Sequence, residues 1–320
     1  MLHPIANPGA GADDDPRQVP SPDGKVVLIT GASSGFGALI ARALAAAGHT
    51  VYAGMRQLDG RNAAAATALT DYATSNGFTI HPVDLDVTDQ QTIDRAIATL
   101  LETTQRLDVV VHNAGHMVLG PAEAFTPEEL AGQYDVNVLG TQRVNRTVLP
   151  RLRGQGSGHL VWISSNSVHG GTPPFVGPYF AAKSAMDNLA VTYAGELIRF
   201  GIETTIVVPG AYLSGTNHFA HSGRPADTAR AAEYDDLYGE FQRQMSERLG
   251  ALIPDEATPD AVADAVVTAV NAPPGHRPYR LHVDPSRNGG EVVANVADRV
   301  RAEFLYRAGL ADLLTPTSSL

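Results

Sequence analysis

Short apolar runs recur along the chain, and a stretch with helical periodicity follows nearly every one of them. The first run, Val26-Val27-Leu28-Ile29, is apolar at each position and is therefore typical of a strand buried on both faces. Further runs lie at 50–53, 79–83, 107–111, 159–163, 203–208 and 279–283, with helical patterns at 38–47, 62–75, 90–104, 127–150, 179–200 and 257–271. This alternation predicts an α/β protein with a doubly wound parallel sheet.

The composition excludes several classes of protein and of functional site. The chain has 320 residues, of which 43% are hydrophobic, and its formal net charge is −11. The hydrophobic content supports a large core, and the negative charge argues against nucleic acid or an anionic membrane as the main partner. The chain has no cysteine, which excludes disulfides and thiolate chemistry, and its 11 histidines show no metal-ligand spacing. No apolar run approaches the roughly 18 residues of a membrane span, so we expect a cytoplasmic protein.

Three segments are expected. Residues 1–23 are rich in Pro, Gly and Asp and are expected to form a flexible tail. Residues 24–284 are expected to form a single domain, in which the long polar segment at about 212–253 is interpreted as a substrate lid. Residues 285–320 are expected to form a C-terminal extension with a helical pattern at about 289–308.

A glycine-rich turn follows the first strand and opens the first helix. Glycines allow close approach of a pyrophosphate, and the helix presents its free N–H groups to that anion. The alternative is an ordinary turn between a strand and a helix, but the strand-turn-helix context favours a nucleotide. The candidate cofactor-binding residues of this turn are Gly31, Ser33, Ser34, Gly35, Phe36 and Gly37.

The spacing of this turn, T-G-x-x-x-G-x-G, resembles the signature of the short-chain dehydrogenase/reductase family, and further family motifs follow in order over residues 24–284. The resemblance implies a Rossmann fold and cofactor contacts from these later motifs. They are Asp86-Val87 at the adenine, Asn113-Ala114-Gly115 after the fourth strand, Tyr179-x-x-x-Lys183 on a helix, and Pro209-Gly210 after the sixth strand.

The end of the second strand bears on the choice of nicotinamide cofactor. An acidic residue there accepts hydrogen bonds from the ribose of NAD, whereas an arginine suits the 2′-phosphate of NADP. The strand runs into Met55-Arg56 with no acidic residue at the expected position, and Ser34 is a second candidate donor. The alternative for Arg56 is a solvated surface residue. We expect NADP, with NAD the second choice.

Tyr179 and Lys183 are four positions apart, which places them on one face of a helix. The pKa of a tyrosine hydroxyl in water is about 10, and a neighbouring ammonium group lowers that pKa. The sequence therefore predicts Tyr179 as the general acid/base, with Lys183 lowering its pKa and, by the resemblance, holding the nicotinamide ribose.

The partner serine is less sharply defined. The family uses the second Ser of a pair such as Ser164-Ser165, but Ser165 precedes Tyr179 by 14 positions, one more than usual, and Ser167 precedes it by 12. Ser165 ranks first and Ser167 second. The resemblance also implies that Asn137 orders a water against Lys183. Ser214 or Thr216 would stand near the nicotinamide amide.

Together these patterns predict an NADP-dependent oxidoreductase that interconverts a carbonyl and a secondary alcohol. The resemblance implies a small-molecule substrate and a homodimer or homotetramer, and the substrate pocket is expected to be walled by His169, Phe175 and Tyr212. The alternative from another class is a nucleotide-sensing regulator without turnover. Such a regulator would be expected to have a damaged Tyr/Lys pair, and here the pair is intact.

Overall fold

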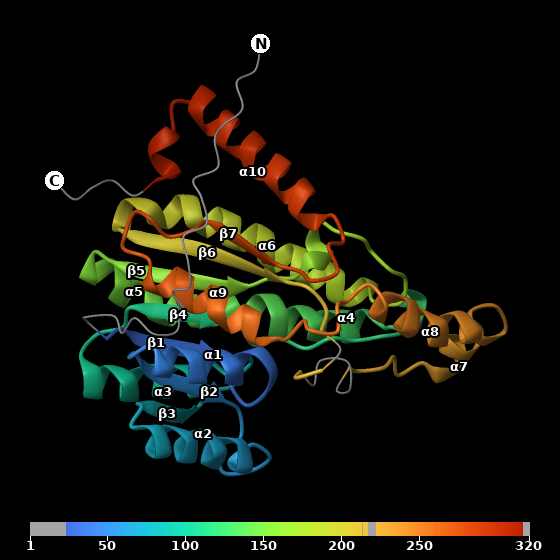
Figure 1. Cartoon of the computed structure of the whole chain (residues 1–320), viewed down its shortest axis with the longest axis horizontal. Helices are drawn as coiled ribbons and strands as arrows, with labels where there is room; N and C mark the ends of the chain where they lie inside the picture. The colour runs from blue at the N-terminus through green and yellow to red at the C-terminus, as the bar shows by residue number, and fades with distance from the viewer. Residues whose placement is uncertain (1–23, 213, 217–221, 316–320) are drawn as a thin grey trace.

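A seven-stranded parallel sheet forms the centre of the computed structural model, which describes residues 24–212, 214–216 and 222–315 (Figure 1). The strand order is β3-β2-β1-β4-β5-β6-β7, and every neighbouring pair is parallel. The predicted doubly wound sheet is therefore confirmed. The strands are β1 (Val26–Thr30), β2 (Thr50–Met55), β3 (Ile80–Asp84), β4 (Val109–His112), β5 (Gly158–Ile163), β6 (Ile202–Pro209) and β7 (Arg280–Val283).

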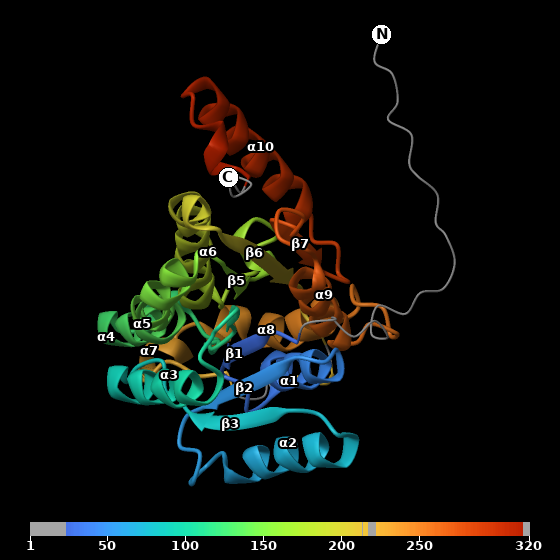
Figure 2. The same cartoon turned by 90° about the vertical axis from the view of Figure 1, so that its left-hand side faces the viewer.

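Helices cover both faces of the sheet (Figure 2). The main ones are α1 (Gly35–Ala46), α2 (Ala63–Asn76), α3 (Gln90–Thr104), α4 (Pro127–Tyr134), α5 (Gly140–Gln155), α6 (Gly177–Leu197) and α9 (Asp260–Asn271). One core packs α1, α2 and α9 against the sheet, and the other packs α3, α5 and α6. Alternate residues of β1 serve the two cores, with Val27 in the first and Leu28 in the second.

The chain changes direction across the sheet between β1 and β4. From β1 the order proceeds through β2 to β3 at one edge of the sheet. β4 lies on the other side of β1, and β5, β6 and β7 follow it to the opposite edge. In open α/β sheets a ligand crevice forms at such a switch point, outside the carboxyl ends of the strands. The expected glycine turn follows β1, and Asn113 to Gly115 follow β4, so both motifs meet at this crevice.

The backbone is helical throughout the predicted 127–150, but its hydrogen-bonding pattern changes along the way. α4 ends at Tyr134, a π-helical turn spans Asp135–Leu139, and α5 begins at Gly140. A π turn closes hydrogen bonds one residue further apart than an α-helix does, so it rotates the side chains that follow. Periodicity in the sequence does not reveal the change, because the apolar spacing resumes on both sides of it.

The polar segment after β6 contains two helices, α7 (Thr228–Ala232) and α8 (Asp235–Gly250), which project to one side of the sheet (right in Figure 1). The last helix, α10 (Gly290–Arg307), corresponds to the predicted C-terminal helical pattern. It lies outside the two helical layers (Figures 1 and 2). An apolar row along it is exposed. That row comprises Val292, Val296, Val300 and Phe304. The predicted tail, residues 1–23, lies outside the described residues.

Candidate active site

The glycine turn adopts a conformation that its residue types require. Gly31 and Gly35 have φ angles of +69° and +53°, a region that side chains disfavour. A Cβ at Gly31 would lie 2.8 Å from Cα of Ala114, so the turn packs directly against the loop after β4. Gly37 is equally confined, because its Cβ would overlap the carbonyl oxygen of Gly31 and the Asn113 side chain. The turn can therefore lie close to the sheet only with glycine at these positions.

Thr30 and Asn113 join the ends of β1 and β4. The Asn113 amide donates to the carbonyl oxygens of Thr30 at 2.9 Å and Gly31 at 3.0 Å. In return, Thr30 Oγ1 accepts hydrogen bonds from the backbone N–H groups of Asn113 and Ala114. This reciprocal network fixes the two loops on either side of the crevice.

The N-terminus of α1 has the properties of an anion site. Ser34 occupies the N-cap position, its side chain makes no capping hydrogen bond, and the first turn of the helix contains no acidic residue. The free N–H groups and the positive end of the helix dipole are therefore available to a phosphate. Gly35 borders open space, where the nearest side-chain atom is Cβ of Thr216 at 4.0 Å from a Cβ built at Gly35.

Arg56 lies just after β2, with its side chain exposed, whereas the preceding Met55 is buried in the core. Two contacts hold the loop that carries it: Asn62 donates to the Arg56 carbonyl oxygen at 2.6 Å, and Asp84 accepts from the Leu58 N–H at 3.4 Å. The Arg56 charge also helps to lower the pKa of His116, after the effect of burial. Because β2 pairs with β1, Arg56 lies at the same edge of the sheet as the glycine turn.

Asp86 and Val87 follow β3. The Asp86 carboxylate accepts hydrogen bonds from the Thr88 N–H and hydroxyl, at 2.9 and 2.8 Å, which fixes the turn. Val87 is buried, and a Cβ at Gly140 would lie 2.8 Å from the Val87 side chain. The start of α5 therefore packs directly against the loop that would contact an adenine.

Ser165 and Tyr179 are brought together by β5 and α6. The Ser165 side chain lies close enough to the Tyr179 hydroxyl to oppose the rise of its pKa by hydrogen bonding. Ser165 Oγ also accepts hydrogen bonds from the Ser167 hydroxyl at 2.8 Å and from the Ser167 N–H at 3.2 Å. Since both contacts from Ser167 are donated to Ser165, the hydrogen of Ser165 is available for Tyr179. Ser167 thus contacts Tyr179 through Ser165, while Ser164 donates to Asp187 at 2.6 Å.

Lys183 lies one turn after Tyr179 and is also buried. Its ammonium group donates to the carbonyl oxygen of Ile163, at the end of β5, at 2.8 Å. Burial lowers the pKa of Lys183 to about 8, and the charge of Asp187 opposes that change. A buried ammonium with a pKa near neutrality changes its charge readily with its surroundings.

Asn137 occupies the centre of the π-helical turn and is fully buried. Its Nδ2 donates to the backbone and side-chain oxygens of Gln133, at 3.0 and 3.1 Å, whereas its Oδ1 has no hydrogen-bond partner. A Cβ at Gly115 would lie 2.5 Å from this Oδ1 and 3.7 Å from Lys183 Nζ. The unpartnered oxygen and the ammonium group therefore border the same space beside Gly115.

The pKa of Tyr179 differs from expectation. Instead of being lowered by Lys183, it is raised to about 12, because burial disfavours the phenolate more than the Ser165 hydrogen bond stabilises it. Tyr179 packs in an apolar cluster with Met117, Val118, Phe125 and Val176. The sequence spacing predicts the neighbouring ammonium, but not this apolar packing.

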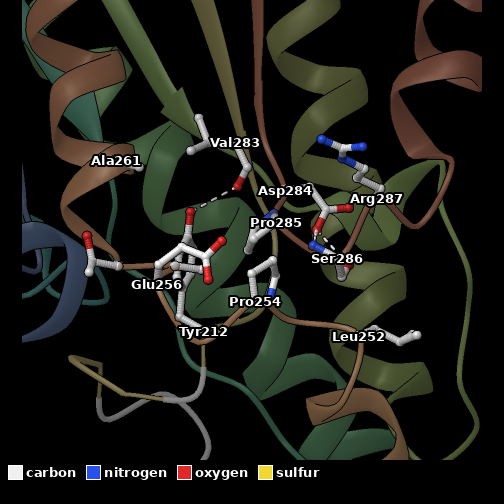
Figure 3. Close-up of a pocket in the computed structure, with 12 residues that line it drawn as sticks. Tyr212, Leu252, Pro254, Glu256, Ala261, Val283, Asp284, Pro285, Ser286 and Arg287 are labelled. Atoms are coloured by element: carbon white, nitrogen blue, oxygen red, sulfur yellow. Dashed lines mark hydrogen bonds between the residues drawn. The ribbon is translucent and has the colours of Figure 1, made fainter.

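The three expected wall residues lie in different surroundings. Tyr212 borders a cavity of about 670 Å³ between the loop before α9 and the loop after β7, and its hydroxyl donates to the Val283 carbonyl oxygen at 3.2 Å (Figure 3). Phe175 instead packs against Tyr234, Tyr238 and Phe241 of the α7–α8 segment. His169 is close enough to His282 of β7 to influence its pKa. Gly210 donates to the Val283 carbonyl oxygen at 2.9 Å, so the Pro209-Gly210 motif adjoins the cavity.

Three residues of this region were not anticipated from the sequence. Asp187 is buried beside Ser164, and Arg280 of β7 joins it to Asp298 of α10. Asp187 does carry a signal, because it continues the series of Tyr179 and Lys183 at the same spacing of four. Arg280 and Asp298 carry none, since only the tertiary fold brings them to this place.

Comparison with known proteins identifies the family. The family model described as short chain dehydrogenase matches residues 25–225. The chain belongs to the short-chain dehydrogenase/reductase family. It is 32% identical to estradiol 17-beta-dehydrogenase 1 of Rattus norvegicus, over 78% of this chain and 72% of that protein.

Solved structures of family members agree with the fold. The structure of a short-chain dehydrogenase from Streptomyces avermitilis has a TM-score of 0.66 and 30% identity, covering 90% of this chain and 98% of that one. A gluconate 5-dehydrogenase from Burkholderia cenocepacia, in complex with NADP and tartrate, has a TM-score of 0.64 and 25% identity, covering 82% and 94%. The family uses nicotinamide cofactors and acts on small molecules.

The residues of the crevice fit such a cofactor. The uncapped, acid-free N-terminus of α1 suits a pyrophosphate, and the unpartnered oxygen of Asn137 provides a polar acceptor beside Lys183. Among residues 24–212, 214–216 and 222–315, no group of three or more His and acidic side chains is arranged to hold a metal ion. No helix in these ranges combines the length and apolar character that crossing a membrane requires.

Proposed function

We propose that the chain is an NADP-dependent oxidoreductase that interconverts a carbonyl and a secondary alcohol, with Tyr179 as general acid/base. The observation that carries this proposal is the convergence of three buried side chains at the carboxyl edge of the sheet: Ser165 lies next to the Tyr179 hydroxyl, and Lys183 follows Tyr179 by one helical turn. The name of the estradiol dehydrogenase relative supports alcohol–carbonyl chemistry in the family.

The bound nicotinamide would supply or accept the hydride. In the direction of reduction, the hydroxyls of Tyr179 and Ser165 donate to the substrate oxygen, and Tyr179 transfers its proton to it. The raised pKa of Tyr179 keeps that proton in place at neutral pH. Lys183 then compensates the phenolate, and a water held between Lys183 Nζ and Asn137 Oδ1 would carry the replacement proton.

The experiment that tests this function is a panel of ketones and secondary alcohols assayed with NADPH and NADP by nicotinamide absorbance. We expect turnover of at least one member of the panel, and faster turnover with the phosphorylated cofactor than with NADH or NAD. Cofactor binding without turnover of any substrate would contradict the proposal and favour a nucleotide sensor. We also propose a cytoplasmic location and a homodimer or homotetramer, the latter measurable by light scattering.

Ser165→Ala is expected to reduce kcat by about a hundredfold, because it removes one donor to the substrate oxygen. Ser167→Ala should reduce kcat by less than about tenfold, since Ser167 acts only by orienting Ser165. Steady-state kinetics of both variants with the same ketone measure the difference. The reverse order would assign the substrate contact to Ser167.

Arg56→Ala is expected to raise the Kd of NADPH by about tenfold or more, because a charge-assisted contact to the 2′-phosphate contributes about 1.5–3 kcal/mol. The Kd of NADH should stay nearly unchanged, since NADH has no group at that position. Fluorescence titration measures both constants, and Arg95→Ala, which removes an exposed arginine from α3, is the control. Equal weakening of NADPH and NADH would mean that Arg56 does not select the phosphate.

A further inference from the structure

Asp187 is a buried carboxylate in the middle of α6, with only 3% of its surface exposed. It follows Lys183 by four residues and Tyr179 by eight, so the three side chains lie on one face of the helix. A buried carboxylate is costly unless it is paired and hydrogen-bonded, so its partners explain why it is tolerated there.

The partners of Asp187 come from two strands that end near the site. Ser164, at the end of β5, donates to Oδ1 at 2.6 Å. Arg280 of β7 donates to Oδ1 at 2.9 Å and to Oδ2 at 3.3 Å, a two-pronged contact. Because Ser164 precedes Ser165, Asp187 connects the Lys183 turn of α6 with the backbone that carries Ser165.

Arg280 is shared with a second carboxylate. Its Nε donates to Oδ2 of Asp298 on α10 at 2.8 Å, and its NH2 group lies 3.4 Å from Oδ1. The Arg280 side chain is 5% exposed, and that of Asp298 is 23% exposed. Two carboxylates around one guanidinium leave a net charge of −1, one helical turn from the ammonium group of Lys183.

We propose that Asp187, held by Arg280 and Asp298, is a positioning residue that keeps Lys183 charged and aligned with Ser165. This inference rests on the proposed function, because it assigns a role in that same site. It also gives the C-terminal helix α10 a part in the reaction, since Asp298 is the outer end of the chain of contacts.

Electrostatics give the direction of the effect. Burial lowers the pKa of Lys183, and the charge of Asp187 raises it. Other titratable or charged groups face this region. They include Tyr179 on α6, Tyr279 before β7, His282 on β7, and Glu291 and Arg301 on α10, and the Arg301 guanidinium lies 5.4 Å from the centre of the Tyr279 ring. On the side of Asn137, His116 interacts with Gln133 at 2.7 Å. Arg280 and Arg301 are cations on this side and oppose a charged Lys183, whereas Asp187 is the carboxylate whose charge raises the Lys183 pKa.

The test is Asp187→Asn, which keeps the shape of the side chain and removes its charge. We expect kcat for ketone reduction to fall about tenfold at neutral pH, and the alkaline limb of the kcat/KM profile to move down by about one pH unit. A second readout, the free energy of unfolding in urea from pH 6 to 10, needs no cofactor. In the wild type and in Asp187→Asn, the difference between the protein with Lys183 and its Lys183→Met variant reports the titration of Lys183. In the Asp187→Asn background, the pH range of that titration should shift in the same direction.

Glu203→Gln is the matched control. Glu203 pairs with Arg277 at 3.5 Å, both side chains are 8% exposed, and the pair lies at the opposite end of β6 from the site. We expect this variant to lose stability without any shift of the alkaline limb. An equal shift in Glu203→Gln would reduce the Asp187 effect to general destabilisation and overturn the proposal.

Asp298→Asn keeps the inference testable if Asp187→Asn does not fold, because Asp298 is partly exposed and Arg280 retains Asp187. It should move the alkaline limb in the same direction by a smaller amount. Unchanged profiles in both variants, with Tyr179→Phe inactive, would overturn the role of Asp187 while leaving the proposed function intact. Full activity of Tyr179→Phe would instead overturn the proposed function itself.

Discussion

Replacing Tyr179 with phenylalanine is expected to lower kcat by about a hundredfold or more, while the Kd of NADPH stays within about twofold of the wild type. The ring of Tyr179 fills the apolar cluster of Met117, Val118, Phe125 and Val176, and phenylalanine fills it equally well. Only the hydroxyl that meets Ser165 is lost. Steady-state kinetics and fluorescence titration separate the two effects.

Tyr193→Phe provides the control on the same helix. Its hydroxyl donates to Gln142 at 2.6 Å, on the side of α6 that faces α5, so its loss should leave kcat unchanged. Nearly normal turnover in Tyr179→Phe would remove Tyr179 from the chemistry. A large loss of NADPH binding would instead indicate that its hydroxyl holds the cofactor.

Lys183→Met is expected to abolish measurable turnover and yet stabilise the protein at neutral pH. Burial lowers the pKa of Lys183 from 10.5 to about 8. That difference corresponds to a cost of about 3 kcal/mol for burying the charged side chain, which the methionine variant avoids. The variant also loses the hydrogen bond to Ile163, which destabilises it by about 1 kcal/mol. The variant should therefore be more stable than the wild type by about 2 kcal/mol at pH 7, as measured by urea unfolding.

The pH dependence of this difference has a definite sign. Below pH 8 Lys183 is charged in both the folded and unfolded states, so the wild type carries the full cost of burial. Between pH 8 and 10.5 the folded state releases the proton while the unfolded chain still binds it, so the wild type gains stability as the pH rises. The advantage of Lys183→Met should therefore shrink across this range. A Lys183→Met variant that is less stable than the wild type at pH 7 would show that the buried Lys183 charge does not destabilise the folded protein.

The order of strands and helices could be predicted because each strand is apolar at nearly every position and each helix has its own period. Gly31 and Gly37 were equally informative, since the close packing of their turn permits no side chain. The spacing of Tyr179 and Lys183 predicted that they lie one turn apart. Whether Ser165 or Ser167 contacts Tyr179 required the structure, because an extra residue in the loop after β5 shifts both.

Other features of the site depend on contacts between distant segments. The raised pKa of Tyr179 arises from apolar residues after β4 and before α6 that no local pattern connects. Arg280 reaches Asp187 across 93 positions of sequence. The place of Asn137 in a π-helical turn is also hidden, because the helix resumes with the same apolar period on the other side.

In that π-helical turn, the number of residues determines the direction of the side chains as much as the residue types do. Deleting one residue from Asp135–Leu139 would allow α4 and α5 to join into a regular helix, a change that local backbone energy favours. A π turn takes up one residue more than an α turn for about the same rotation, so α4 and α5 would keep nearly the same faces toward the sheet and only the side chains of the turn would change direction. The chain would keep almost all of its residues and lose the direction in which Asn137 points. In this segment, then, the number of residues carries functional information that residue-by-residue identity between relatives does not measure.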